Sequence, residues 1–425
     1  METLNAYESV VGPQAIAQLR KAAEPLAGRR VKMVNSTAVG GGVAEILHRL
    51  VPLLNELGIH TEWRVMEGDA EFFRVTKLFH YALQGDPTDI GADDLEIFLD
   101  TNRRNLVELA GDEDVVVIHD PQPLALIEAR AKAPASRWVW RCHIDVSRPQ
   151  PQLWEFLKPF VARYDAAIYS SDRFRQRMSM PEHVFCPPID PLSDKNIELS
   201  AAAIDKVFAR LGVPRDKPIV TQVSRFDRLK DPIGVVRAFR IARRHVDCRL
   251  VLVGGVADDD PDGALVLAEV LEEANGDPDI HVLGGRLYED RDINALVRGS
   301  AIVLQKSLRE GFGLTVAEAM WKGKPVIASA VGGLPLQVID DVTGVLVSSV
   351  EETAAQIRAL LGDPQRMRKL GEAGRRHVAR EFLITRNLGR WLDLLGQLDA
   401  DRAPPRSRRS VAPQGRGFGE RDGAR

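Results

Sequence analysis

The stretch QKSLREGFGLTVAEAMWKGKPVIASAVGG, from Gln305 to Gly333, decides the fold. A short apolar strand (301–304) leads into it, and Gly311 and Gly313 then break the chain into a loop. A helix follows, and its apolar face carries Val316, Ala317, Met320 and Trp321. Lys322-Gly323 ends that helix, and 325–330 has the pattern of a second buried strand. A strand, a glycine-rich loop and a helix predict one unit of a doubly wound α/β sheet, with an anion site at the start of the helix.

Two glutamates stand eight positions apart in this stretch, Glu310 in the loop and Glu318 inside the helix. A retaining glycosidase needs its two carboxyl groups about 5–5.5 Å apart. Eight residues of helix rise roughly 12 Å, so even a partly looped path separates these two side chains widely. The spacing therefore argues against hydrolysis by this pair and favours contacts with different parts of one ligand.

The sequence EGFGLTVAEAM, followed by GKPVIAS, resembles the signature of retaining, nucleotide-sugar-dependent glycosyltransferases of family 4. The resemblance implies a GT-B fold, in which two Rossmann-like doubly wound domains face each other across a cleft. It implies that Glu310 faces the donor sugar and that Glu318 binds the ribose. It also implies a front-face transfer, in which the leaving phosphate oxygen helps to deprotonate the acceptor hydroxyl.

Composition argues against a nucleic-acid-binding, a membrane-spanning and a disulfide-stabilised protein. A chain of 425 residues predicts two domains, and 44% hydrophobic with 28% charged residues is ordinary for a globular protein. The net charge of −3 gives no global attraction to nucleic acid or to a membrane surface. The three cysteines form no CxxC pair, which favours a reducing, cytoplasmic location. We see no signal peptide and no apolar run that could span a bilayer.

Alternating strand and helix patterns divide the chain into two parts. Residues 1–190 predict a first Rossmann-like domain, and residues 191–383 predict a second one. The resemblance implies that the first domain binds the acceptor and that the second binds the nucleotide sugar. The proline-rich segment 187–191 is the predicted linker, and a helix over 384–398 is expected to cross back onto the first domain. The basic tail, 401–425, is expected to be disordered and solubilising.

The first domain places polar residues after its strands. The segment NSTAVGGG (35–42) follows the first strand, and its three glycines allow backbone to approach a ligand closely. It lacks the spacing G-x-G-x-x-G, so an NAD site is not expected. His119-Asp120 and His143 end two other strands, and the insert 68–85 carries Arg74, Lys77 and His80 among aromatic residues. Ligands bind beyond the carboxyl ends of such strands, so these side chains are candidates for a site.

The second domain offers cations for a diphosphate leaving group. Arg225 and Lys230 lie in SRFDRLK at a strand end, and the N–H groups of Leu314 and Thr315 open the following helix. The nucleotide base is expected against the loop 284–287, at Gly284 and Leu287. The D-x-D in 258–260 has the surroundings of a solvated acidic loop. We therefore predict no protein metal site and no tightly bound cofactor, although a diphosphate can bring its own Mg²⁺.

Four segments of the first domain extend the resemblance to residues 25–395. They are VNSTAVGGGVAEILHRLVPLLNELGI, EWRVMEGDAEFFRVTKLFHYALQG, HDPQPLAL and WRCHIDVSRP, and together they resemble trehalose synthases of the glycosyltransferring type. Those enzymes join the glucose of a nucleoside-diphosphate glucose, such as UDP-glucose or ADP-glucose, to free glucose, giving α,α-trehalose reversibly.

The resemblance carries a set of residue roles. It implies that His143 hydrogen-bonds near the reacting sugar, with Glu310, Arg225 and Lys230 as the other catalytic residues. Donor contacts are implied for Gly41, Gly42, Gly311, Phe312 and Gly313, and acceptor contacts for Arg74, Lys77, His119 and Asp120. Three alternatives stay open: a retaining trehalose phosphorylase, a family 4 transferase with another acceptor, and a non-catalytic sugar or nucleotide binder. A homodimer also stays open.

Overall fold

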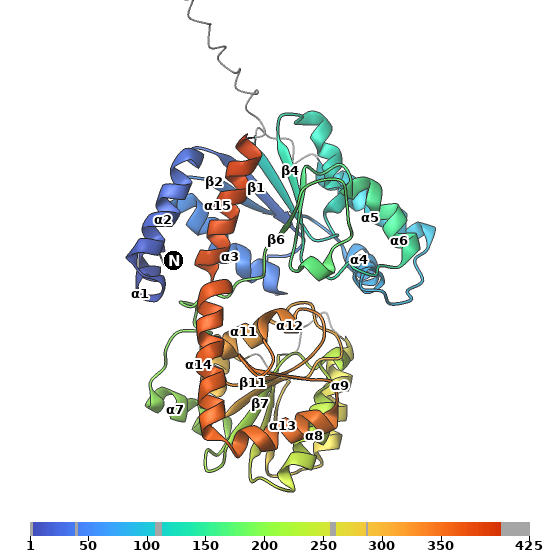
Figure 1. Ribbon diagram of the computed structural model, residues 1–425. Helices are drawn as coiled ribbons and strands as arrows, with labels where there is room; N and C mark the ends of the chain where they lie inside the picture. The colour runs from blue at the N-terminus through green and yellow to red at the C-terminus, as the bar shows by residue number, and fades with distance from the viewer. Residues whose placement is uncertain (1–2, 39–40, 107–112, 256–260, 286–287, 401–425) are drawn as a thin grey trace, which may run out of the picture.

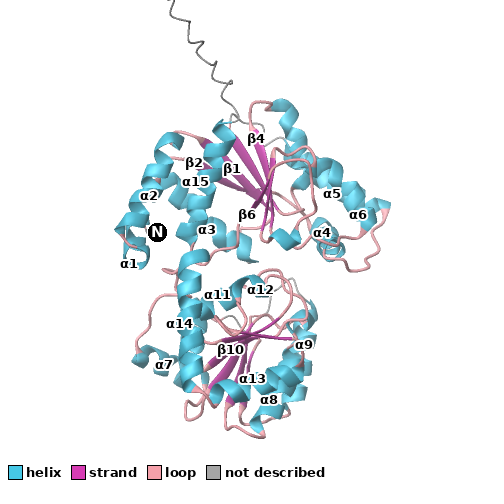
Figure 2. Cartoon of the chain, in the orientation of Figure 1, coloured by secondary structure: helices cyan, strands magenta, loops and turns pink. Residues whose placement is uncertain are grey.

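The computed structural model describes residues 3–38, 41–106, 113–255, 261–285 and 288–400. They form two α/β bodies, one above the other, with helices on the faces of each sheet (Figures 1 and 2). Each sheet has six strands, and all neighbouring strands within a sheet pair in parallel. The predicted pair of Rossmann-like domains is confirmed.

The first sheet has the order β2-β1-β3-β4-β5-β6. Its strands are β1 (Arg30–Asn35), β2 (His60–Val65), β3 (Val115–His119), β4 (Arg137–Cys142), β5 (Ala166–Tyr169) and β6 (Glu182–Val184). Strand β3 shows why both faces are covered: Val116 and Ile118 join one hydrophobic cluster, and Val115 and Val117 join another. A strand with apolar side chains on both faces needs helices on both sides, which the parallel connections supply.

Helices cover the first sheet in two groups. On one face α15 packs against α2 and α3, and on the other α4 packs against α5 and α6. The helices are α1 (Glu8–Val11), α2 (Pro13–Ala23), α3 (Gly41–Glu56), α4 (Ala70–Leu83), α5 (Ala92–Asn105), α6 (Pro151–Val161) and α15 (Ile384–Ala400). Segment 68–85, treated as an insert in the sequence, is mostly helix α4, and the Asp69 carboxylate caps it by accepting from the Phe72 N–H.

The second sheet has the order β12-β11-β10-β7-β8-β9. Its strands are β7 (Ile219–Val223), β8 (Arg249–Val253), β9 (Ile280–Leu283), β10 (Ile302–Gln305), β11 (Val326–Ser329) and β12 (Val345–Val347). Its helices are α7 (Ala201–Leu211), α8 (Pro232–Arg243), α9 (Pro261–Ala274), α10 (Asp290–Gly299), α11 (Leu314–Trp321), α12 (Leu334–Gln337), α13 (Val350–Leu361) and α14 (Pro364–Glu381).

Each strand order reverses at one point, and ligands bind at such switch points in open α/β sheets. In the first sheet the reversal lies between β1 and β3, and in the second between β7 and β10. Along the chain, Gly42 and Asp120 come after β1 and β3, and Lys230 and Glu310 come after β7 and β10. The topology therefore gathers the candidate residues of each domain at a single crevice.

The chain passes between the domains twice, and the two crossings lie side by side. The Ile189 N–H donates to the Phe382 carbonyl at 2.8 Å, and the Ile384 N–H donates to the Ile189 carbonyl at 2.9 Å. Helix α14 packs on α11 in the second domain, whereas α15 packs on the first. We call this paired crossing the hinge. Within the described parts of the chain, no helix has the length and apolar character needed to cross a membrane.

Candidate active site

A cavity of about 430 Å³ lies between the two switch points, which is a usual size for a small-molecule site. The first domain and the linker line it with Gly42, Val43, Ile46, His80, Asp120, His143, Ile144 and Pro187. The second domain lines it with Val223, Ser224, Arg225, Lys230, Gln305, Glu310, Phe312, Gly313, Leu314 and Thr315. The second-domain wall thus carries Arg225, Lys230 and Glu310, and the first-domain wall carries Asp120 and His143, which follow two strands.

An ion pair dominates the second-domain wall. The Lys230 ammonium bonds both carboxylate oxygens of Glu310, at 2.7 and 2.6 Å. Gln305 Nε2 and Ser307 Oγ donate to the same Glu310 oxygen, both at 3.0 Å. The carboxylate is therefore fixed by three side chains, while an ammonium has three N–H donors and spends only two on Glu310. The third points to a role for Lys230 toward an anionic ligand.

Hydrogen bonds between strand ends hold this ion pair in place. The Gln222 amide donates to the Lys230 carbonyl at 2.9 Å and accepts from the Lys306 N–H at 3.0 Å, which ties the loop after β7 to the loop after β10. Gln305 is held in turn by Thr315 Oγ1, which donates to its side-chain oxygen at 2.8 Å. The Leu308 N–H also donates to the Leu229 carbonyl at 2.8 Å. The two loops behave as one preorganised unit.

Two helix N-termini open on the cavity. Gly41 is the first residue of α3, and Gly42 and Val43 follow in its first turn, while Leu314 and Thr315 begin α11. A Cβ on Gly42 would stand 3.2 Å from the Leu314 side chain, so only glycine permits this approach of the two helices without adjustment. Gly313 has φ +79°, which turns the chain into α11. Free N–H groups and helix dipoles from both domains make this end of the cavity favourable for an anion.

The remaining predicted donor residues differ in position. Arg225 lines the cavity, but Gly284 packs against Phe226 and Leu267, and Leu287 lies outside the described residues. Within the E-G-F-G loop, the Gly311 carbonyl accepts from the Gly333 N–H at 2.9 Å. Phe312 lines the cavity and packs edge-on against Phe382 of the hinge, with ring centroids 5.8 Å apart. The loop beside Glu310 is thus in contact with the crossing between the domains.

Glu318 is buried in α11 with 7% of its surface exposed, and it does not line the cavity with Glu310. Burial raises the pKa of its carboxyl group, and the ammonium groups of Lys322 and Lys195 oppose that shift. Lys195 bonds Glu45 of α3 at 2.8 Å, which links this corner of the second domain to the first. The two glutamates face different surroundings, so they are not arranged as a hydrolytic pair.

The first-domain wall is built at the ends of β3 and β4. Asp120 adopts φ +66°, a left-handed conformation that directs its carboxylate back to the neighbouring strand. Its Oδ1 accepts from the His143 N–H at 2.7 Å, and its carbonyl accepts from Trp140 Nε1 at 3.1 Å. Burial raises the pKa of Asp120 to about 6, against the lowering effects of that N–H and of Arg141. Asp120 is therefore a carboxylate that can change protonation state near neutral pH.

Helix α4 presents His80 to the cavity and turns Arg74 and Lys77 away from it. Phe72, Val75 and Phe79 occupy the buried face, so the helical period places positions 74 and 77 on the solvent side. Arg74 bonds Asp94 at 2.8 Å with its side chain 51% exposed. His80 lines the cavity, and burial, with a smaller effect of the Arg225 charge, lowers its pKa to about 4. The structure brings His80, and neither basic residue, to the place expected for the acceptor.

His119 also differs from its predicted place. It is 2% exposed and lies behind His143, with its Nδ1 3.1 Å from His143 Nε2. The side chain of a residue at the end of a central strand can turn into the sheet's covering layer as readily as into the crevice, and the sequence does not distinguish the two. Direct acceptor contact by His119 is not what this geometry favours, whereas His143 and Asp120 reach the cavity.

Several residues that line the cavity were not predicted from the sequence as site residues. Gln305 is the last residue of β10 and Ser224 follows β7, so their positions at strand ends could have marked them. The apolar contributors Val43, Ile46 and Ile144 carry no chemical signal in the sequence. They enter the site only because α3 and the loop after β4 meet there.

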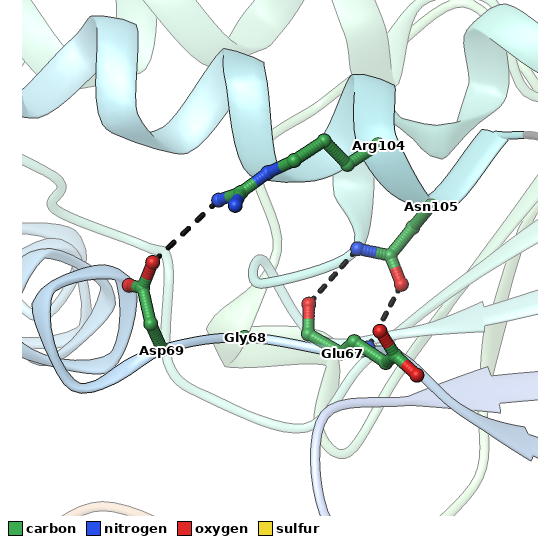
Figure 3. A pocket seen from close by; sticks show the side chains of 5 residues that line it. All are labelled: Glu67, Gly68, Asp69, Arg104 and Asn105. Atoms are coloured by element: carbon green, nitrogen blue, oxygen red, sulfur yellow. Dashed lines mark hydrogen bonds and ion pairs between the residues drawn. The ribbon is translucent and has the colours of Figure 1, made fainter.

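A second cavity, of about 290 Å³, lies on the first domain and is lined by Glu67, Gly68, Asp69, Arg104 and Asn105 (Figure 3). Its polar groups pair with one another: Asn105 exchanges two hydrogen bonds with the Glu67 backbone, and Arg104 lies 3.6 Å from Asp69. Because these partners satisfy one another, the cavity offers little to a ligand.

Metal binding has no support from the described side chains. They form no group of three or more His, Cys, Asp or Glu residues able to hold an ion. The acidic loop 258–260 lies outside the described residues.

Comparison with known proteins identifies the two halves. Residues 33–176 match the family model "Trehalose synthase, N-terminal domain", and residues 203–377 match "Glycosyl transferases group 1". The chain is 44% identical to a trehalose synthase from Pyrococcus horikoshii over 93% of its own length and 96% of that protein. The chain belongs to the trehalose synthase family. It is a trehalose-related glycosyltransferase.

More distant similarities agree with this family. A trehalose phosphorylase from Pleurotus pulmonarius is 29% identical over 93% of this chain, which spans 61% of that longer protein. The solved structure of an α,α-trehalose-phosphate synthase (UDP-forming) from Burkholderia vietnamiensis aligns with a TM-score of 0.70 and 16% identity, over 88% of this chain and 99% of that one. At that identity the structural match shows the shared fold of this trehalose synthase family member.

Proposed function

We propose that this enzyme makes α,α-trehalose from a nucleoside-diphosphate glucose and free glucose, with retention of configuration and in a reversible reaction. The observation that carries the proposal is the polarity of the cavity. Two helix N-termini, Arg225 and Lys230 form an electropositive end, and Asp120, His143 and His80 form an end with hydroxyl-binding groups. A diphosphate suits the first end and a glucose unit suits the second.

In the proposed reaction the bond between the glucosyl C1 and the diphosphate oxygen breaks. The acceptor hydroxyl oxygen bonds to the same face of C1, and its proton passes to the leaving phosphate oxygen. Lys230, Arg225 and the backbone N–H groups of α11 would stabilise the charge that grows on that oxygen. Glu310 would orient Lys230 and the donor sugar. It is not assigned the role of a nucleophile, because Lys230, Gln305 and Ser307 already engage its carboxylate.

Groups of the first domain would position the acceptor. Asp120, when ionised, would accept from a glucose hydroxyl, and His143 would contact the reacting sugar. Glu318 would accept from the ribose hydroxyls, which requires a rearrangement around its buried side chain. Contacts across the hinge, through Phe312 and Phe382, would couple closure of the cleft to the donor loop and exclude water from a reactive glucosyl group.

A product assay tests this proposal. Purified protein is incubated with glucose and either UDP-glucose or ADP-glucose, with and without Mg²⁺, while trehalose and released nucleotide are measured. We expect trehalose and nucleoside diphosphate in equal amounts. If nucleotide is released only when another sugar is supplied in place of glucose, that sugar would replace glucose as the acceptor in the proposal.

A retaining trehalose phosphorylase is the second candidate. The similarity to a fungal trehalose phosphorylase over 93% of this chain favours it, since inorganic phosphate could occupy the same electropositive end. Formation of glucose 1-phosphate from trehalose and phosphate, with no response to either nucleotide sugar, would select this function over the first.

A further inference from the structure

Two histidines form a stacked pair behind the acceptor end of the cavity. His119 ends β3, and the parallel register sets it opposite Arg141 of β4, two residues before His143. The rings lie 5.4 Å apart at an interplanar angle of 19°, and His119 Nδ1 stands 3.1 Å from His143 Nε2. That separation is a hydrogen bond, so one of the two nitrogens must carry the shared proton.

The two histidines differ in exposure to the cavity. His143 lines the cavity, whereas His119 is 2% exposed and its Nε2 is buried with no hydrogen-bond partner among the described residues. The Nε2 of His143 is occupied by His119, so Nδ1 is the His143 nitrogen left for a ligand. His119 can therefore affect a ligand only through His143.

Both rings are neutral at physiological pH. Burial lowers the pKa of His119 to about 3, with a smaller contribution from the Arg141 charge, and burial with Arg141 also lowers the pKa of His143. Arg141 is itself buried, and its guanidinium donates to the Phe185 carbonyl at 2.6 Å. A second positive charge beside it would be unfavourable, so each imidazole carries one proton.

Only two proton arrangements are then available. If His143 Nε2–H donates to His119 Nδ1, the single proton of His119 must sit on its Nε2, which leaves a buried N–H without a partner. If His119 Nδ1–H donates to His143 Nε2, His119 Nε2 is a bare acceptor and His143 carries its proton on Nδ1. Buried N–H groups without partners are rarer in proteins than buried acceptors without partners, so the second arrangement is favoured.

We propose that His119 is a positioning residue that fixes His143 as its Nδ1–H tautomer, so that the cavity wall presents a hydrogen-bond donor to an oxygen of the bound sugar. The identity of that sugar rests on the proposed function. Asp120 and His119 then divide the work: the Asp120 carboxylate anchors the His143 backbone at 2.7 Å, and His119 sets its ring and its proton.

Nitrogen NMR of the full-length protein labelled at histidine tests the tautomer directly, without substrate. The His143 signals are assigned by their loss in His143→Asn. We expect a protonated Nδ1 and an unprotonated Nε2 in the wild type, and a shift toward the Nε2–H form in His119→Leu. A wild-type His143 protonated at Nε2 overturns the proposal. The measurement needs no activity, so an enzyme that makes no trehalose but shows this tautomer would refute only the proposed function.

Kinetics of paired variants supply the second test. His119→Leu removes the donor and should lower kcat about tenfold, the order expected for one lost hydrogen bond. His119→Asn can donate an amide N–H near the position of Nδ1 and should retain severalfold more turnover. KM for the nucleotide sugar should change little in both. Equal losses in the two variants would point to packing alone and would contradict the proposal.

His281→Leu is the matched control. His281 lies on β9 of the second domain, and its Nε2 is likewise buried without a partner among the described residues. It does not line the cavity. Its replacement should leave kcat and the His143 tautomer unchanged.

Discussion

The two walls of the cavity hold their polar groups by different physical means. The second-domain wall uses charge: Lys230, Glu310, Gln305 and Ser307 form a network in which every contact is 2.6–3.0 Å. The first-domain wall uses burial, which keeps His80 neutral, does the same for His119 behind the wall, and raises the pKa of Asp120. A wall with cationic groups suits a diphosphate leaving group, and a partly desolvated wall with imidazoles and one carboxylate suits sugar hydroxyls.

The largest effect should come from breaking the charged wall. Lys230→Ala removes the ammonium that would meet the leaving diphosphate, and we expect kcat to fall about 10²–10³-fold. Arg228→Ala is the control in the same turn, because Arg228 pairs with Glu269 at 2.6 Å on the surface and should change kcat less than about twofold. Steady-state assays at saturating donor measure both. An unchanged kcat for Lys230→Ala would remove its assigned role.

A smaller effect is expected at Glu318, which is buried in α11 outside the charged wall. Glu318→Gln keeps the shape of the side chain but weakens its acceptance from ribose hydroxyls. We expect the Kd and KM of the nucleotide sugar to rise about ten- to a hundredfold with kcat less affected. Calorimetric titration with the nucleoside diphosphate measures binding, and a thermal melt checks the fold because Lys322 lies beside this residue. Unchanged nucleotide affinity would place the ribose elsewhere.

The first-domain wall should affect the pH dependence of kcat/KM for glucose. Asp120 has a pKa raised to about 6, so it is ionised above that pH and protonated below it. If the ionised form binds glucose, kcat/KM for glucose should fall about tenfold per pH unit below pH 6. His80 and His119, with pKa values of about 4 and 3, titrate at more acidic pH, so the profile is measured near the pKa of Asp120. Asp120→Asn should lack this limb, and its persistence there would assign it to another group.

The smallest effect compares two faces of one helix. Arg74→Ala and Lys77→Ala change the exposed face of α4 and should alter KM for glucose less than about twofold, since exposed ion pairs contribute little. His80→Ala, on the cavity face, should raise that KM about tenfold through a lost hydrogen bond. A larger effect of Arg74→Ala than of His80→Ala would restore the acceptor contact predicted from the sequence.

The sequence by itself determined the architecture and the charged wall. Local chain order sets Glu310, Leu314 and Thr315, because a strand end, a loop and a helix start must follow one another wherever the unit sits. The pairing of Glu310 with Lys230 joins two such units and depends on the fold. The two parallel sheets follow from the alternation of strand and helix patterns, and both are found.

Only the tertiary structure decided which residues form the first-domain wall. Whether His119 or His80 reaches the cavity depends on the register of β3 with β4 and on the rotation of α4, which set directions that no local pattern contains. The strand order that places both switch points at one crevice is likewise a property of long-range pairing. The pKa of Asp120 follows from burial by neighbours distant in sequence, and so it appears only when the chain is folded.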